Sequence, residues 1–287
     1  MKKPVVFGIG EIVWDCLPDG EKLGGAPVNF CYYAGKAGAV TFPVSAIGED
    51  VLGKRTLESC AAFGLDTRFI QRNVLSTSRV LVEKDAAGVP RYNILENVAW
   101  DALEAPADVL GALAGADALC WGSLAGRSEP SFLAIRRMLA SVPERCFKVY
   151  DINIRQHYFT REKIADSLRL ADILKVSDEE FPVLQDLFGL PEEPVRAIDR
   201  LQRDYSLRMV IYTGGAKFSE IYTPEGLHSH LPTPKVNVAD TVGAGDSFTA
   251  TFITSLLLGH SITEAHRKAV EIAARVCACP GAIVPLD

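Results

Sequence analysis

The most informative stretch of the sequence is Asn237-Val-Ala-Asp-Thr-Val-Gly-Ala-Gly-Asp-Ser-Phe248, which runs directly into an apolar segment at residues 249–258. Gly243 and Gly245 come just before this segment, which is long enough to form a buried helix. Glycine lets the backbone turn sharply and leaves its N–H groups uncovered, and a helix N-terminus adds partial positive charge to those donors. The stretch therefore predicts an anion-binding turn at the start of a helix.

Asp246 is the unusual member of this turn. A carboxylate among amides that attract anions would repel a phosphate, unless it has a chemical task such as accepting the proton of an attacking hydroxyl group. The alternative is that Asp246 caps the helix. The residues of this stretch leave both interpretations open.

The run Asp240-Thr-Val-Gly-Ala-Gly-Asp-Ser-Phe248 resembles the C-terminal signature of the ribokinase-like sugar kinases, the PfkB carbohydrate kinase family. The resemblance implies that Asp246 is the catalytic base and that Gly243, Ala244 and Gly245 form the hole for the transferring phosphate. It also implies phosphoryl transfer from MgATP to a primary hydroxyl of a sugar, so ATP and Mg²⁺ are the expected cosubstrate and metal.

The composition fits such an enzyme. The 287 residues, 48% of them apolar, are enough for one α/β domain with a sizeable core. The net charge of −6, with no basic block, argues against a nucleic-acid or anionic-membrane partner. No apolar segment approaches the ~18 residues of a membrane span. The seven cysteines include no Cys-x-x-Cys pair and indicate reduced thiols in a cytoplasmic protein.

The N-terminal part carries the expected sugar contacts. A buried strand at residues 5–10 leads to an extended piece with Asp15, and Gly24-Gly-Ala-Pro-Val-Asn29 opens a helix. This Gly-Gly pair with a later asparagine resembles the family's N-terminal signature. The resemblance implies that Asp15, Gly25 and Asn29 hydrogen-bond sugar hydroxyls. The alternatives are a turn role for Asp15 and a helix-terminal role for Asn29.

Two glycine patterns suggest nucleotide-binding motifs that neighbouring residues exclude. Residues 8–10 lack the third glycine of a dinucleotide-binding turn, because Val13 occupies its place. Residues 48–54 have the spacing of a P-loop, but Arg55 stands where that motif needs Ser or Thr to hold magnesium.

Residues 78–100 predict an antiparallel ribbon, with strands at 79–83 and 91–95 around a turn at 85–88. The resemblance implies that this insert forms a small β-sheet lid that closes over the sugar and in many relatives pairs with a second subunit. A homodimer through the lid is therefore the expected assembly. Trp100 either covers the substrate or belongs to the core.

Alternating strands and helices in the rest of the chain predict a parallel sheet with helices on both faces. The expected fold is one ribokinase-like, doubly wound α/β domain over residues 1–287, with lid inserts at about 13–25 and 78–100. Asp151-x-Asn-x-Arg155 follows a strand, at the end where ligands bind in such sheets. Arg155 is expected to steady the sugar or the γ-phosphate; a surface ion pair is the alternative.

Two further segments resemble the nucleotide site of the family. The family usually has Asn-x-x-Glu after a strand; Glu180 fits, which implies a contact with magnesium through water, whereas Ser177 replaces the asparagine. A serine can still bond a phosphate, and Ser177 with Glu180 also has the form of a capping box. Thr213 and Gly215 match the nucleotide-binding Thr-x-Gly of relatives, but Phe218 stands where a glycine is usual.

The last predicted helix, at residues 263–279, is expected to wall the adenine. The loop after it, together with the backbone of Ala239 and Asp240, resembles the monovalent-cation site of many relatives, for which K⁺ is the candidate.

Fructose is the expected substrate, because the segments around Asp15, Pro27, Ser123 and Arg155 together resemble fructokinases. The alternative within the family is 2-keto-3-deoxygluconate. Its carboxylate would call for additional Arg or Tyr side chains from the lid, and residues 79–92 contain both types.

The alternative from another class is a sugar- or nucleotide-responsive binding protein that has kept the fold and lost turnover. The replacements at Ser177 and Phe218 favour it, whereas the intact Asp246 and glycine turn favour an enzyme.

Overall fold

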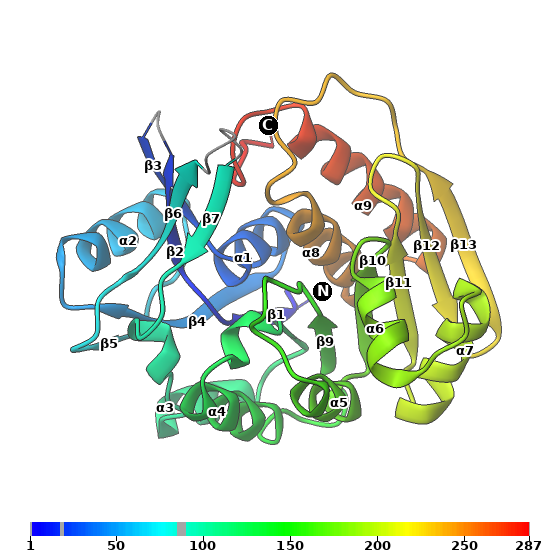
Figure 1. The fold of residues 1–287 in the computed structure, drawn as a ribbon, viewed down its shortest axis with the longest axis horizontal. Helices are drawn as coiled ribbons and strands as arrows, with labels where there is room; N and C mark the ends of the chain where they lie inside the picture. Colours follow the sequence, from blue (N-terminus) through cyan, green and yellow to red (C-terminus); the bar gives the residue numbers. More distant parts are fainter. Residues whose placement is uncertain (1, 18–19, 85–89, 287) are drawn as a thin grey trace.

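The computed structural model describes residues 2–17, 20–84 and 90–286 of the chain, so the predicted turn at residues 85–88 lies outside the described residues. Within the described ranges the strands form a nine-stranded main sheet in the order β13-β12-β11-β10-β9-β8-β1-β4-β5, and a separate small sheet in the order β3-β2-β6-β7 (Figure 1). The strands of the main sheet are β1 (Val5–Ile9), β4 (Val40–Gly48), β5 (Ile70–Asn73), β8 (Ala118–Trp121), β9 (Phe147–Asp151), β10 (Ile173–Ser177), β11 (Met209–Thr213), β12 (Phe218–Thr223) and β13 (Gly226–Pro232).

The helices are α1 (Ala26–Lys36), α2 (Val51–Ala62), α3 (Ala107–Leu113), α4 (Glu129–Leu139), α5 (Arg161–Leu170), α6 (Phe181–Phe188), α7 (Pro194–Tyr205), α8 (Ala244–Leu257) and α9 (Ile262–Cys277), with the short 3-10 helices η1 (Ala99–Ala102) and η2 (Leu124–Gly126).

The main sheet is parallel from β5 to β11 and antiparallel only at β12 and β13, where the chain returns as a hairpin. The expected fold class, a mostly parallel sheet with helices and a small separate sheet, is confirmed. The β1 sequence Val-Val-Phe-Gly-Ile shows why: Val6, Phe7 and Ile9 are all buried. Such a continuous apolar run is typical of a strand covered on both faces.

Helices cover both faces of the main sheet (Figure 1). On one face α1, α2, α8 and α9 enclose a core that includes Phe252 and Val149, and on the other α3 to α7 enclose a core that includes Leu119 and Tyr150. Helix α8 packs between α1 and α9 and is buried continuously from Ser247 to Ser255, as its apolar sequence predicts. This burial fixes the position of its first turn.

The small sheet consists of β2 (Val13–Leu17), β3 (Gly20–Gly24), β6 (Ser78–Lys84) and β7 (Pro90–Ile94). The outer pairs are antiparallel, whereas β2 and β6 pair in parallel at the centre, so both predicted inserts contribute to one sheet. It stands apart from the main sheet, beside α1 and α2 (Figure 1).

Trp100 lies in η1 at the base of the small sheet and is 1% exposed. It belongs to an apolar cluster with Val13 and Val80, and the Arg127 guanidinium lies 4.0 Å from its ring centroid. Arg127 is paired with Asp101 at 2.7 Å. Trp100 is therefore a core residue that supports the small sheet, and its ring is not free to cover a substrate.

In the turn with P-loop spacing, at residues 48–54, a side chain of the protein occupies the place where a phosphate would bind. The Asp50 carboxylate caps α2 by accepting a hydrogen bond from the Gly53 N–H at 2.7 Å, and its other oxygen accepts one from the Thr77 N–H at 2.8 Å. Lys54 points into solvent beside Glu58. An anion therefore has no place at this helix start, as Arg55 predicts.

No helix in the described ranges is both long enough and apolar enough to cross a membrane.

Candidate active site

Polar side chains gather at the carboxyl ends of three neighbouring parallel strands. Asp151 ends β9, Ser177 ends β10 and Thr213 ends β11, and Ser177 and Thr213 are register partners. The carboxyl edge of a parallel sheet is where α/β proteins bind ligands. The main sheet therefore presents these three sequence-predicted segments side by side.

The glycine turn begins α8, with Gly243 as the N-cap residue at φ 81°. A Cβ at Gly243 would lie 2.5 Å from the Ala282 carbonyl oxygen, so only glycine fits there. No side chain caps this helix, and Asp246 lies within its first turn. The Ala244 N–H donates to the Thr241 carbonyl at 3.3 Å, but no side chain occupies the other donors of this helix start, and Asp246 is not the cap residue.

Asp246 is held by the other helix that points at the site. The Asn29 Nδ2 on α1 donates a hydrogen bond of 2.8 Å to Asp246 Oδ2. Burial raises the pKa of Asp246 to about 6, and the Asp151 charge raises it further, whereas the bond from Asn29 and the charges of Lys175 and Arg155 lower it. Asp246 is therefore ionised at neutral pH, yet basic enough to take a proton.

Lys175 and Asp151 form a buried ion pair beneath this turn. The Lys175 Nζ lies 3.0 Å from Asp151 Oδ1, and the Thr249 hydroxyl on α8 lies 3.0 Å from Asp151 Oδ2. Burial lowers the pKa of Lys175, but the charges of Asp151 and Glu180 outweigh it and the net shift is upward. The ammonium group is therefore charged inside the protein.

Glu11 is a further buried carboxyl group at the site, 4% exposed, just after β1. Burial raises its pKa to about 7 and the charge of Asp246 adds to the increase, whereas a backbone hydrogen bond and the charge of Arg155 oppose it. Arg155 thus acts electrostatically on both Asp246 and Glu11. The surface-ion-pair alternative for Arg155 is less favoured, since within the described residues no ion pair links it to a neighbouring carboxylate.

Asp15 and Gly25 lie at the junction of the small sheet and α1. Asp15 is on β2, where burial, and then the charge of Asp240, raises its pKa. Gly25 has φ 117°, and a Cβ there would lie 2.3 Å from the Glu11 carbonyl oxygen. The fold itself therefore requires glycine at position 25, whether or not a sugar contacts its backbone.

Ser177 and Glu180 form the predicted reciprocal pair. Glu180 Oε2 accepts hydrogen bonds from the Ser177 N–H at 2.9 Å and hydroxyl at 2.8 Å. Its other oxygen accepts from the Ile154 N–H at 2.9 Å, which ties the loop carrying Arg155 to β10. Ser177 and Glu180 thus bond each other and join the loop at Ile154 to β10.

Phe218 reshapes the hairpin after β11. Its ring lies over Gly214, where a Cβ would come within 2.5 Å of it, and it packs against Tyr212 with ring centroids 5.6 Å apart. The turn closes through a 2.9 Å bond from the Lys217 N–H to the Gly214 carbonyl. Gly215 adopts φ 53° at the tip of this turn, beside Thr213.

The C-terminal segment passes against the glycine turn. Tyr33 on α1 donates a 2.8 Å hydrogen bond to the Ala282 carbonyl and accepts one of 3.1 Å from the Val284 N–H. Both oxygens of the Asp240 carboxylate accept backbone hydrogen bonds, from Val242 and from Gly281. The segment, α1 and α8 are therefore joined around the site.

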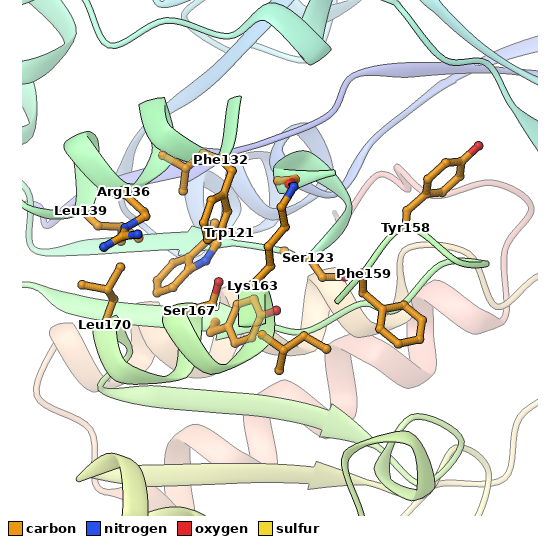
Figure 2. Close-up of a pocket in the computed structure, with 15 residues that line it drawn as sticks. Trp121, Ser123, Phe132, Arg136, Leu139, Tyr158, Phe159, Lys163, Ser167 and Leu170 are labelled. Atoms are coloured by element: carbon orange, nitrogen blue, oxygen red, sulfur yellow. The ribbon is translucent and has the colours of Figure 1, made fainter. Parts of the chain in front are cut away.

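A small hollow of about 10 Å³ opens at this junction. Its lining includes Pro27 on α1, Asp151 on β9 and Asp246 on α8. Figure 2 shows a different cavity, also of about 10 Å³, beneath α4 and α5 on the opposite side of the sheet. Trp121, Phe132 and Lys163 line that second cavity, and none of the sequence-predicted site residues does.

Lys175, Thr249 and Glu11 were missed as site residues from the sequence. The signal for Lys175 was a charged residue inside the otherwise apolar strand Ile-Leu-Lys-Val. Thr249 carried no signal, because hydroxyl residues are common in helices and its partner Asp151 is 98 residues away.

Residues 19–287 match the family model described as pfkB family carbohydrate kinase. The chain therefore belongs to this family and is a carbohydrate kinase. Fructokinase from Escherichia coli is 28% identical over 271 residues, which cover 88% of this chain and 84% of that protein. The binding-protein alternative is not supported, because the family match makes the chain a phosphotransferase.

Solved structures agree on the fold. Fructokinase from Xylella fastidiosa with bound ATP has a TM-score of 0.87 at 20% identity, covering 98% of this chain and 94% of that one. Fructokinase from Vibrio cholerae O395, bound to fructose, ADP and calcium, has a TM-score of 0.81 at 22% identity, again covering 98% and 94%. At these identities the likeness shows the fold alone.

Proposed function

We propose that this protein is an ATP-dependent fructokinase, which transfers the γ-phosphoryl group of MgATP to a primary hydroxyl of fructose. The observation that carries the proposal is Asp246, a half-buried carboxylate that accepts a 2.8 Å hydrogen bond from Asn29 and lies beside a glycine turn with no side-chain cap. A base and an anion-binding turn in one place suit transfer of a phosphoryl group to a hydroxyl.

The sugar would bind between the small sheet and the carboxyl end of the main sheet. Asp15 on β2, the backbone beside Gly25, Asn29 on α1 and Arg155 would hydrogen-bond its hydroxyls, and Asp246 would face the reacting one. Carboxylate, amide and guanidinium groups supply the acceptors and donors that vicinal hydroxyls need. The small sheet would close over the bound sugar and exclude water, which otherwise competes for the phosphoryl group.

The nucleotide would lie along β10 and β11, with Ser177, Thr213 and Gly215 near its phosphates and the N–H groups of residues 243–245 facing the γ-phosphate. Bound Mg²⁺ would neutralise phosphate charge. A contact of Glu180 with Mg²⁺ would run through water, because its carboxylate already accepts three protein hydrogen bonds. Mg²⁺ commonly retains several waters beside phosphates.

In the reaction, the carboxylate of Asp246 accepts the proton as the sugar oxygen attacks phosphorus. Proton acceptance of this kind contributes about 10²–10⁴-fold to rate. The turn amides stabilise the charge on the phosphoryl oxygens, and such donors are worth on the order of 10²–10³-fold each. Asn29 holds Asp246 in place for this task.

K⁺ would bind between the loop after α9 and the backbone of Ala239 and Asp240. Comparing turnover in KCl with turnover in choline chloride tests this cation site. A homodimer would form through the small sheet, whose outer strands β3 and β7 each pair on one side only within the described residues. Sedimentation at several protein concentrations tests the dimer.

The decisive test is ADP release from MgATP over fructose, 2-keto-3-deoxygluconate, ribose, tagatose and adenosine, with Asp246→Asn as the matched isosteric control. We expect turnover with fructose that falls at least 10²-fold in Asp246→Asn. Near-full turnover in that variant would overturn the base assignment. Preference for another sugar would replace fructose but leave the kinase chemistry in place.

A further inference from the structure

Lys175 is a cation buried in the middle of the protein. It lies in β10 with an exposed fraction of 8%, between Leu174 and Val176, which are fully buried. Its Nζ lies 3.0 Å from Asp151 Oδ1, and the two residues are register partners on adjacent strands. Taking a lysine out of water is costly even when it is paired, so this position calls for an explanation beyond packing.

The ammonium group lies directly beside the glycine turn. A Cβ at Gly245 would be 3.2 Å from Lys175 Nζ and 3.9 Å from its Cε, so the lysine occupies the space next to that backbone. Cations are normally unfavourable at a helix N-terminus, where the helix dipole is positive. Lys175 and the start of α8 therefore together form a concentration of positive charge that suits an arriving anion.

Asp151 and Thr249 hold the ammonium group in this place. Asp151 Oδ2 lies 3.0 Å from the Thr249 hydroxyl, and the same hydroxyl lies 3.0 Å from the Gly245 carbonyl oxygen. The lysine is thus tied, through one carboxylate and one hydroxyl, to the turn whose amides would receive the phosphoryl group. The direction of the Lys175 side chain is therefore set by Asp151 of the sheet and, through it, by Thr249 of α8.

We propose that Lys175 is a further catalytic residue of the phosphoryl-transfer site, whose ammonium group contacts the γ-phosphoryl group held at residues 243–246. This inference rests on the proposed kinase reaction. As the bond between phosphorus and the sugar oxygen forms, the bond between phosphorus and the bridging oxygen of ADP breaks. The hydroxyl proton passes to Asp246, and Lys175 keeps its own proton throughout. Asp151 and Thr249 are positioning residues that act through Lys175.

A purely structural role for the pair makes different predictions. If Lys175 only neutralised Asp151, then removing both charges together would restore the enzyme, because no unpaired buried charge would remain. If Lys175 contacts the γ-phosphoryl group, the double variant must be as poor as the lysine variant alone. The γ-phosphate is also absent from ADP, so a contact with it affects MgATP binding and not MgADP binding.

The experiment compares Lys175→Met, Asp151→Asn and the double variant Lys175→Met/Asp151→Asn by calorimetric titration with MgATP and with MgADP, and by turnover on the accepted sugar. The matched control is Lys148→Met, which removes a β9 lysine that pairs with Asp172 at 3.9 Å, away from the strand ends that carry the site. Melting temperatures report folding for each variant.

We expect Lys175→Met and the double variant to bind MgATP at least tenfold more weakly, with MgADP affinity within twofold of the original. Turnover should fall on the order of 10²–10³-fold in both, whereas Asp151→Asn loses less and Lys148→Met is unchanged. Double-variant turnover within tenfold of the original, or equal weakening of MgATP and MgADP, would overturn the proposal. If the single lysine variant fails to fold, the double variant decides.

The titrations contain no sugar, so they separate this inference from the proposed function. Absence of turnover with every sugar tested would contradict the proposed function, while the ratio of MgATP to MgADP affinity would still decide the role of Lys175. Normal turnover with an unchanged ratio in the double variant would contradict only the Lys175 assignment.

Discussion

The Asn29 side chain on α1 donates a 2.8 Å hydrogen bond to the Asp246 carboxylate on α8, and so joins two residues that are 217 positions apart in the chain. Asn29 lies in the first turn of α1 and Asp246 in the first turn of α8, so this bond holds the Asp246 carboxylate between the starts of two helices. Burial and the Asp151 charge raise the pKa of Asp246, and the bond from Asn29 on another helix opposes that increase.

Removing that amide should shift the pH dependence of activity. In the unaltered protein Asp246 has a pKa of about 6, so kcat/KM should fall with decreasing pH around that value as the carboxylate becomes protonated. Asn29→Ala removes a hydrogen bond to the charged form, which is worth about 1.5–3 kcal/mol. The pKa of Asp246 should rise by about one to two units, and the acidic limb of the kcat/KM profile should move to higher pH by the same amount.

Asn29→Asp serves as the companion variant, because it places a second negative charge beside Asp246 and should move the limb further in the same direction. An acidic limb that stays in place in both variants would show that Asp246 is not the group whose ionisation the profile reports.

The two glycines of the turn should respond differently to a methyl group. Gly243→Ala forces a side chain into φ 81° and within 2.5 Å of the Ala282 backbone oxygen, which cannot move aside. We expect a loss of at least about 2 kcal/mol in unfolding free energy, since the left-handed conformation alone costs roughly 1–2 kcal/mol. Gly245→Ala meets the flexible end of Lys175 at 3.2 Å and should cost less stability.

Urea unfolding of both variants, together with kcat, tests this difference. Gly245→Ala should fold with most of its stability and lose turnover, because the methyl group displaces the ammonium group from the turn. Equal stability losses in the two alanine variants would contradict the steric argument.

Tyr33 should stabilise the C-terminal segment more than its neighbour Tyr32 does. The Tyr33 hydroxyl bonds both the Ala282 carbonyl and the Val284 N–H, whereas the Tyr32 hydroxyl bonds only the Val284 carbonyl, at 3.1 Å. Tyr33→Phe leaves two buried backbone groups without a partner and should cost about 1–3 kcal/mol. Turnover should also fall, because Ala282 lies against Gly243.

Tyr32→Phe is the matched control for that measurement, and its loss of unfolding free energy should be smaller. A Tyr32→Phe variant as unstable as Tyr33→Phe would mean that aromatic packing, and not the double hydrogen bond, holds the segment.

His266 should make the protein sensitive to acid. It is fully buried between Ser219 and Ser229, whose hydroxyls lie 2.7 and 2.8 Å from its two ring nitrogens. Burial, aided by the charge of His230, lowers its pKa from 6.5 to about 4. Between pH 6.5 and 4 the unfolded state therefore binds a proton that the folded state does not, and the unfolding free energy should fall with decreasing pH by up to about 1.4 kcal/mol per unit.

Urea unfolding at pH 7 and at pH 5 measures this slope. His266→Gln should show a shallower dependence on pH, whereas the same change at the exposed His228 should leave the slope as it is. Identical slopes in all three proteins would show that His266 does not carry the effect.

Local sequence patterns were enough to predict the main strands and helices and the glycine turn at the start of α8. Local signals were sufficient for β1, with its continuous apolar run, and for α8, with Gly243 and Gly245 before a buried segment, because glycine conformation and apolar periodicity act over a few residues. The same holds for the reciprocal pair of Ser177 and Glu180, whose members are three positions apart.

Contacts between residues that are far apart in the chain could not be predicted from the sequence and are seen only in the folded structure. The bond from Asn29 to Asp246, the buried pair of Lys175 with Asp151, and the closure of the first helix turn of α2 by Asp50 depend on how strands and helices pack. Gly25 illustrates the difference. The sequence motif predicts that a glycine matters at this position, but only the structure shows that a Cβ there would collide with the Glu11 carbonyl oxygen. Local residue patterns specify conformation, whereas pKa values and charge placement depend on burial and on neighbours that only the folded chain brings together.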